Sequence, residues 1–287
     1  MLRWGQEVLP KAVKPQVMRR YMTSIVKLEE SFGGKRIGEI TERTIADYIS
    51  SRTLTVSNAT IRRDLTALSR LLSACIVWRW LDSNPARNFD RSIIREQKKP
   101  IILPTDRDIE TVLAAAPAPM VPVLRFLAET GMREDEAVTL EWLEVDEETR
   151  QITLVRTKTN RPRTLRWKTP GGDAERVLST LPERQGWIFP NRNGKPYGNF
   201  ATNFGEVMRW VVDNEKKAGR PFRRFRAHDL RHRFAVRWLK AGGDIYRLSR
   251  HLGHTSVKTT EIYLRALTDD ELDKVMGVTQ TGAHAAE

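Results

Sequence analysis

The feature that most limits how this chain can fold is a charged segment about one third of the way along it. Residues 91–104 include the run Gln97-Lys98-Lys99-Pro100 and end on a second proline. This composition is typical of an extended linker, because like charges repel and proline interrupts helices and strands. A length of 287 residues is also more than one minimal domain needs. The sequence therefore predicts domains at 1–97 and 104–287, joined by a linker at 98–103.

Helical periodicity dominates the first domain. After Pro15, apolar residues recur every three to four positions as far as Phe32, and Gly33-Gly34 end the pattern. Thr41 is a suitable cap for a second helix. The first domain is therefore predicted to be all helical.

A longer helical pattern begins at Ser57. Its apolar face is predicted to continue to Trp80, and the helix is expected to end at Asn84-Pro85. Four arginines interrupt this face and are predicted to be exposed: Arg62, Arg63, Arg70 and Arg79. They either bind phosphates or form the polar side of an ordinary helical bundle, and the sequence leaves both interpretations open.

Clear strand patterns occur only in the second domain. Thr105 is predicted to cap a helix, and further helical patterns follow it. The segments 151–155 and 163–167 flank a turn-like connection and predict an antiparallel hairpin. Residues 187–189 are a candidate edge strand, and helices resume near Asn199. The predicted fold class is mainly α with a small antiparallel sheet.

The chain is strongly basic, with a net charge of +13. Residues 1–99 hold 19 Lys and Arg against 10 Asp and Glu, and residues 215–265 hold 14 against 4. Two separate positive blocks indicate a polyanionic partner, and we expect double-stranded DNA. No apolar run approaches the about 20 residues of a membrane span, so a membrane role is not expected. The single cysteine, Cys75, and the lack of a signal-peptide pattern favour the cytoplasm.

Side chains suited to phosphate chemistry gather between Phe222 and Tyr263. His228 and Arg231 are three residues apart, so on a helix they share one face. His254 lies nine residues before the tyrosine. Phosphoryl transfer requires positioned positive charge, proton handling and a nucleophile, and this segment supplies all three.

Five motifs, in this order, resemble those of the tyrosine recombinase family, which includes phage-type integrases and the Xer recombinases. They are residues 131–137 around Arg133, Thr157-Lys158-Thr159, residues 228–232, Leu252-Gly253-His254 and residues 259–263. The match extends over both domains. It implies an all-helical core-type DNA-binding domain followed by a tyrosine-recombinase catalytic domain.

The resemblance implies a site-specific recombinase for DNA integration and recombination, which cleaves and rejoins strands through a 3′-phosphotyrosyl intermediate. The catalytic residues that it implies are Arg133, Lys158, His228, Arg231, His254 and Tyr263. Tyr263 is expected to be the nucleophile, His228 its base, and Lys158 the acid that protonates the leaving 5′ oxygen. The two arginines and His254 are expected to donate to the phosphate oxygens. No cofactor and no metal are expected, because one phosphodiester is exchanged for another.

Family behaviour implies that four copies assemble on two DNA sites, with accessory DNA-bending proteins as a further class of partner. The acidic run at 269–273 is expected to dock on a neighbouring copy. The chain begins almost directly with the first helical domain, so it is expected to lack an N-terminal arm-binding domain or to be a piece of a longer protein. Arg265 departs from the family pattern, in which a histidine often stands two residues after the nucleophile.

Several alternatives stay open. A type IB topoisomerase shares the tyrosine chemistry, and a DNA-binding regulator without catalysis shares the charge. Four of the five histidines lie within residues 228–254, but no Glu or Cys accompanies them, which disfavours a zinc site. His232 and His251 are assigned structural or supporting roles. Glu136 either orients Arg133 or forms a surface pair with it.

Overall fold

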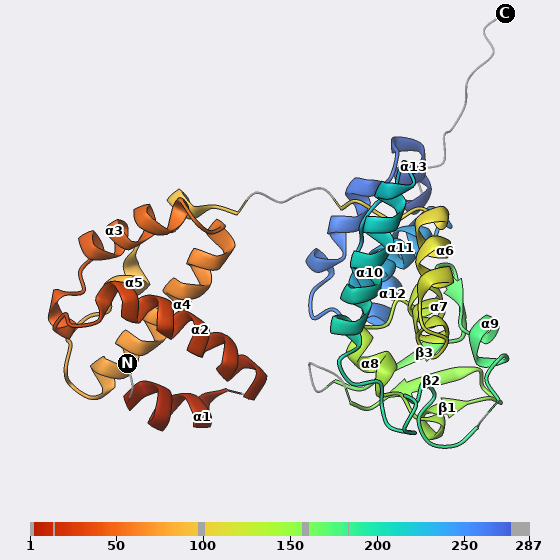
Figure 1. Cartoon of the computed structure of the whole chain (residues 1–287), viewed down its shortest axis with the longest axis horizontal. Helices are drawn as coiled ribbons and strands as arrows, with labels where there is room; N and C mark the ends of the chain where they lie inside the picture. Colours follow the sequence, from red (N-terminus) through yellow and green to blue (C-terminus); the bar gives the residue numbers. More distant parts are fainter. Residues whose placement is uncertain (1–2, 14, 97–100, 157–160, 183, 277–287) are drawn as a thin grey trace, which may run out of the picture. The chain divides into compact units, whose positions relative to one another are not determined.

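The computed structural model describes residues 3–13, 15–96, 101–156, 161–182 and 184–276. The chain divides into two compact units, Met1–Lys99 (unit 1) and Pro100–Glu287 (unit 2), shown in Figure 1. Each unit contains its own cluster of buried apolar side chains. Among the described residues, no helix has both the length and the apolar character needed to cross a bilayer.

Unit 1 contains only helices among the residues described. They are η1 (Trp4–Val8), α1 (Leu9–Ala12), α2 (Pro15–Phe32), η2 (Ile37–Glu39), α3 (Glu42–Thr53), α4 (Asn58–Val77), α5 (Pro85–Asn88) and η3 (Ser92–Ile94). The predicted apolar face of α2 is buried at Tyr21, Leu28 and Phe32. The predicted cap of α3 is also confirmed, because the hydroxyl of Thr41 accepts a hydrogen bond from the backbone N–H of Thr44.

The end of α4 differs from the prediction. The helix ends at Val77, and Trp80 is 49% exposed, so the buried face does not reach Trp80. Asn84 and Pro85 begin α5 instead of ending α4, since the side chain of Asn84 accepts two hydrogen bonds from backbone N–H groups of α5. An Asn-Pro pair can start a helix, because proline is compatible with the first helical turn.

Unit 2 combines helices with two small sheets. Its helices are α6 (Asp106–Ala115), α7 (Met120–Thr130), α8 (Glu134–Val138), η4 (Trp142–Glu144), α9 (Glu175–Leu178), α10 (Phe200–Lys217), α11 (Ala227–Lys240), α12 (Ile245–Leu252), η5 (Val257–Thr259), η6 (Glu261–Ala266) and α13 (Asp269–Met276). The predicted cap at Thr105 is confirmed, because its hydroxyl accepts a hydrogen bond from the backbone of Asp108. Figure 1 shows the three-stranded sheet at one end of the unit and α13 at the other.

The predicted hairpin is confirmed as β2 (Gln151–Leu154) paired antiparallel with β3 (Arg163–Arg166). Two further features were not predicted: β1 (Val145–Asp146), which pairs with β2, and a second sheet of β4 (Lys168–Thr169) and β5 (Gly172–Asp173). The edge strand predicted at 187–189 was wrong, since Trp187 makes only an isolated bridge to Glu141. Pro190 follows at once and lacks the N–H that a longer ladder would need.

Helices α7 and α11 approach closely where α7 ends. Gly131 closes α7 in the left-handed conformation, with a φ of +63°. A Cβ atom on Gly131 would lie 2.3 Å from Cδ1 of Phe234, which is fully buried on α11. Both the backbone and the packing therefore require glycine here, two residues before Arg133 and its candidate site.

We expect Gly131→Ala to destabilise the protein more than Gly219→Ala. Gly219 ends α10 with a nearly identical φ of +64°, but nothing lies within 4 Å of its Cβ position. Both variants should lose about 1–2 kcal/mol through left-handed strain. Only Gly131→Ala should lose about 1–3 kcal/mol more through overpacking against Phe234. Free energies of unfolding from urea titrations would measure the difference, and equal losses would contradict the close packing.

Candidate active site

Arg133 is held at the start of α8, two residues after Gly131. Its guanidinium donates through Nη1 to Oε1 of Glu136 at 3.0 Å, and its backbone N–H donates to Oε2 of the same carboxylate at 3.0 Å. Its Nη2 donates to the carbonyl of Gly253 at 3.1 Å. The side chain is thus fixed between α8 and the segment that follows α12.

Arg231 lies on α11 and is only 2% exposed. It donates through Nη1 to the carbonyl of Gly131 at 2.8 Å and through Nη2 to the carbonyl of Leu252 at 2.6 Å. Burial, together with the nearby charge of Arg133, lowers the pKa of Arg231 to about 10, so it remains cationic at neutral pH. A buried cation bonded to carbonyl dipoles is well suited to receive an anion.

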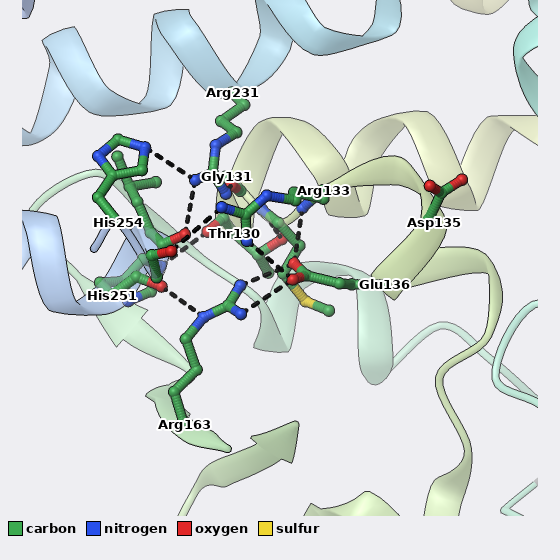
Figure 2. Close-up of polar contacts among 12 residues, drawn as sticks. Thr130, Gly131, Arg133, Asp135, Glu136, Arg163, Arg231, His251 and His254 are labelled. Atoms are coloured by element: carbon green, nitrogen blue, oxygen red, sulfur yellow. Dashed lines mark hydrogen bonds and ion pairs between the residues drawn. The ribbon is translucent and has the colours of Figure 1, made fainter. Parts of the chain in front are cut away.

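His254 completes this group. Nη2 of Arg231 lies 3.2 Å from Nε2 of His254, and Nδ1 of His254 lies 2.8 Å from Oγ1 of Thr260. Because arginine can only donate, Nε2 accepts and Nδ1 carries the proton that bonds Thr260. Burial, followed by the charges of Arg231 and Arg133, lowers the pKa of His254 to about 4. Figure 2 shows Arg133, Arg231 and His254 converging, as expected for a shared anion site.

Glu136 is buried and does not form a surface pair. Its carboxylate receives Nη1 and Nη2 of Arg163 at 2.9 and 2.7 Å, in addition to the bonds from Arg133. Burial raises the pKa of Glu136, but hydrogen bonds and charge from Arg163 and then Arg133 outweigh it and hold this pKa below its ordinary value. Of the two roles left open by the sequence, the structure supports orientation of Arg133.

Arg163 is a residue of the site that was not predicted from the sequence. This residue begins β3 on the same face as the buried Leu165, and its Nε also donates to the carbonyl of His251 at 2.9 Å. Strand alternation was the available signal, because a charged side chain on the inward face of a strand requires a buried partner. Arg163 links the sheet, α8 and α12 around the anion site.

Glu136→Gln is expected to lower the free energy of unfolding by about 3–5 kcal/mol, because it leaves buried guanidinium groups without their carboxylate. The side chain of Glu136 is only 4% exposed, and it pairs with both Arg133 and Arg163. Glu206→Gln provides the control, since Glu206 is 63% exposed and lies 3.9 Å from Arg209. That variant should change stability by no more than about 0.5 kcal/mol. Urea unfolding of both would test this, and similar small losses would show that the buried network contributes little.

Tyr263 lies on η6. The short 3₁₀ helices η5 and η6 flank the fully buried Thr260. Tyr263 is 1% exposed, and its hydroxyl lies 3.0 Å from Nδ1 of His232. Burial raises the pKa of Tyr263, and the charges of Arg231 and Arg133 oppose that rise.

The remaining two predicted catalytic residues have different outcomes. The side chain of His228 is exposed, and its ring is nearly perpendicular to that of His232, with the centroids 4.7 Å apart. Among the described residues no hydrogen bond joins His228 to Tyr263, so the structure does not place it as the partner of the nucleophile. Lys158 falls at residues 157–160, outside the described residues, and its role stays a prediction.

His251 is buried, and its contacts are those of a structural residue. Its Nε2 donates to the carbonyl of Thr130 at 2.8 Å, and its ring stacks on Phe234 at a centroid distance of 5.1 Å. Burial lowers its pKa to about 4, so it is neutral. In the part of the chain that the structure describes, no three His, Cys, Asp or Glu side chains are grouped so as to hold a metal ion.

An open cleft of about 1140 Å³ borders the anion site. Its walls come from β3, β4, α12 and the turns beside them, and it includes Arg163 and His254. Its exposed basic side chains are Arg161, Arg166, Lys168, Arg247 and Arg250. A cleft lined in this way is suited to a chain of phosphates.

Sequence comparison finds a matching family and several relatives. Residues 105–270 match the model of the phage integrase family. The integrase of Escherichia phage P2 is 28% identical over 228 residues, which cover 78% of this chain and 61% of that protein. Tyrosine recombinase XerC of Chlamydia muridarum (strain MoPn / Nigg) is 24% identical over 251 residues, which cover 78% of this chain and 72% of that protein.

Structure comparison shows the fold. A lambda integrase dimer bound to a COC′ core site matches with a TM-score of 0.74 at 16% identity, over 99% of this chain and 79% of that one. A lambda integrase tetramer bound to a Holliday junction also has a TM-score of 0.74, at 16% identity, over 94% and 76% of the two chains. The predicted fold class, a helical domain followed by a mainly α domain with a small sheet, is confirmed.

Proposed function

Because this chain belongs to the phage integrase family of tyrosine recombinases, we propose that it is a site-specific recombinase that cleaves and rejoins DNA through Tyr263. The proposal depends on one observation above all. Arg133, Arg231 and His254 meet around the backbone of residues 252–254, and Tyr263 is close enough for both arginines to influence its pKa. Positive charge and a phenol hydroxyl are the groups that attack on a phosphodiester requires.

The arginines would bind the non-bridging oxygens of the scissile phosphate. A guanidinium has five N–H donors, so Arg133 and Arg231 can keep the carbonyl bonds that orient them and still donate to a phosphate. His254 would join them in its protonated form. The negative charge of a bound phosphate favours that form, although His254 is neutral without it.

Cleavage would then form a bond from Oη of Tyr263 to phosphorus and break the bond to the 5′ oxygen. The leaving oxygen takes up a proton, which the family resemblance assigns to Lys158. A 5′-hydroxyl of another strand would reverse the step and release the tyrosine. The exchange conserves the number of phosphodiester bonds.

Duplex DNA is the proposed substrate. The cleft beside the anion site carries the exposed basic residues Arg161, Arg166, Lys168, Arg247 and Arg250. In unit 1, Arg63 and Arg70 are exposed on α4, whereas Arg62 is half-buried and donates to the carbonyl of Arg91. We assign the core-type DNA-binding role to unit 1 and catalysis to unit 2, with boundaries near residues 97 and 104.

We also propose that four copies act together on two DNA sites. One structural relative is a lambda integrase tetramer on a Holliday junction. Within this single chain, α13 packs against α11, and Lys240 pairs with Glu271 at 3.0 Å. Docking of the acidic segment on a neighbouring copy therefore requires release of this contact, and it stays a prediction.

Covalent capture tests the proposed function. Duplexes selected for binding from a random pool would carry a nick at successive positions, so that the strand released by cleavage diffuses away and the adduct accumulates. We expect a stable protein–DNA complex linked through tyrosine. Relaxation of supercoiled plasmids as a function of sequence would separate the two enzyme classes. Efficient relaxation of a plasmid without a selected site would favour a type IB topoisomerase, and absence of any adduct would favour a DNA-binding regulator.

A further inference from the structure

The hydroxyl of Tyr263 has an unexpected neighbour. Within the described residues its hydrogen-bond partner is Nδ1 of His232, at 3.0 Å, and the two rings lie 5.6 Å apart. His232 is one helical turn beyond His228, so both histidines lie on the same side of α11. His228 contacts the ring of His232 and not the tyrosine hydroxyl. Helical spacing alone would allow either histidine to meet Tyr263, and in the structure His232 is the one that does so.

A carboxylate lies on the other side of the His232 ring. Nε2 of His232 is 4.0 Å from Oδ1 of Asp229, a distance for charge interaction and not for a hydrogen bond. Arg226 holds Asp229 in place, with its Nη2 at 2.9 Å from Oδ1 and its backbone N–H at 2.7 Å from Oδ2. Burial raises the pKa of Asp229, but the bonds and charge of Arg226 lower it overall, so Asp229 is an anion.

This arrangement selects one tautomer of the neutral imidazole. An anion near Nε2 stabilises the proton on Nε2 and leaves the lone pair of Nδ1 directed at the tyrosine hydroxyl. The hydroxyl can then only donate to Nδ1. Tyr263, His232 and Asp229 therefore follow the nucleophile, base and orienting-carboxylate order of other covalent enzymes.

We propose that His232 orients the hydroxyl of Tyr263 and accepts its proton during DNA cleavage, and that Asp229 orients His232. The inference rests on the proposed recombinase function. As the bond from Oη to phosphorus forms, the proton moves from Oη to Nδ1, and the leaving 5′ oxygen takes its proton from the separate acid, Lys158. In rejoining, His232 returns the proton to Tyr263 as the tyrosine leaves.

The test compares cleavage, which requires activation of Tyr263, with ligation, which does not. Cleavage is measured as the single-turnover rate of adduct formation on a selected nicked duplex. Ligation is measured with a strand that carries a 3′-nitrophenyl phosphate, because nitrophenolate leaves without a proton and the reaction needs no tyrosine. Both assays require the same bound DNA and the same phosphate-binding arginines.

His232→Leu is expected to slow cleavage by about 10²-fold or more, the usual contribution of a general base. Its ligation rate should stay within about threefold of the wild-type rate, because ligation does not use this base. His232→Asn should recover part of the cleavage rate, because an amide oxygen can accept the hydrogen bond but cannot take the proton. Arg209→Lys, on the exposed surface of α10, is the control for a substitution outside the site and should match wild type in both assays.

Three outcomes would overturn the inference. If His232→Leu reduces cleavage and ligation equally, the residue has only a structural role. If it cleaves at the wild-type rate or faster, the hydrogen bond does not assist attack. If His228→Leu loses cleavage alone and His232→Leu does not, the base is His228. Failure of the wild-type protein to form any adduct would contradict the proposed function itself, so the two failures are distinguishable.

Discussion

Replacing Tyr263 with phenylalanine is expected to abolish covalent capture of DNA while leaving DNA binding intact. The phenyl ring retains the buried packing of Tyr263, which is 1% exposed, and only the hydroxyl and its bond to His232 are lost. One hydrogen bond contributes about 1 kcal/mol to stability, so the variant should remain folded. Loss of a covalent nucleophile, in contrast, should reduce adduct formation by about 10⁴-fold or more.

Tyr246→Phe is the matched control for this prediction. Tyr246 lies on α12 and is 65% exposed, so loss of its hydroxyl should affect neither binding nor capture. Adducts would be detected on denaturing gels with labelled DNA, and binding would be measured by fluorescence anisotropy. An adduct of normal yield in Tyr263→Phe would show that another residue attacks the phosphate, whatever the family resemblance implies.

The second large effect is expected for Arg231→Lys. Lysine retains the charge but offers one ammonium group where arginine spans the carbonyls of Gly131 and Leu252 and the ring of His254. We expect single-turnover cleavage to fall by about 10²–10³-fold, the usual cost of losing one preorganised donor at a developing negative charge. DNA affinity should change far less, because one phosphate contact among many contributes little to binding.

Arg209→Lys gives the corresponding control. Arg209 lies on α10 with 68% of its side chain exposed, so a change of its head group should leave cleavage unchanged. Thermal unfolding would show whether Arg231→Lys remains folded. Wild-type cleavage by a folded Arg231→Lys protein would mean that the bidentate guanidinium is not needed and that positive charge alone is sufficient.

Local signals explain the predictions that were confirmed. The caps at Thr41 and Thr105 depend on bonds to residues three positions away, and the β2–β3 hairpin depends on neighbouring segments. Such features are encoded within a few residues of where they form. The same reasoning failed at Asn84-Pro85, since one dipeptide can end a helix or begin the next, and only the tertiary arrangement decides.

The site combines local and distant information. The sequence by itself determined which chemical groups are present, because the order and spacing of the arginine, histidine and tyrosine motifs already implied a phosphate-cleaving enzyme of one family. The tertiary structure alone decided that Arg163 joins Glu136 across 27 residues and that Tyr263 contacts His232 across 31. Helical spacing places His228 and His232 on the same face, so it cannot distinguish between them. Which of the two histidines meets Tyr263 depends on where η6 packs against α11. This contact is set by the burial of segments that are far apart in the chain.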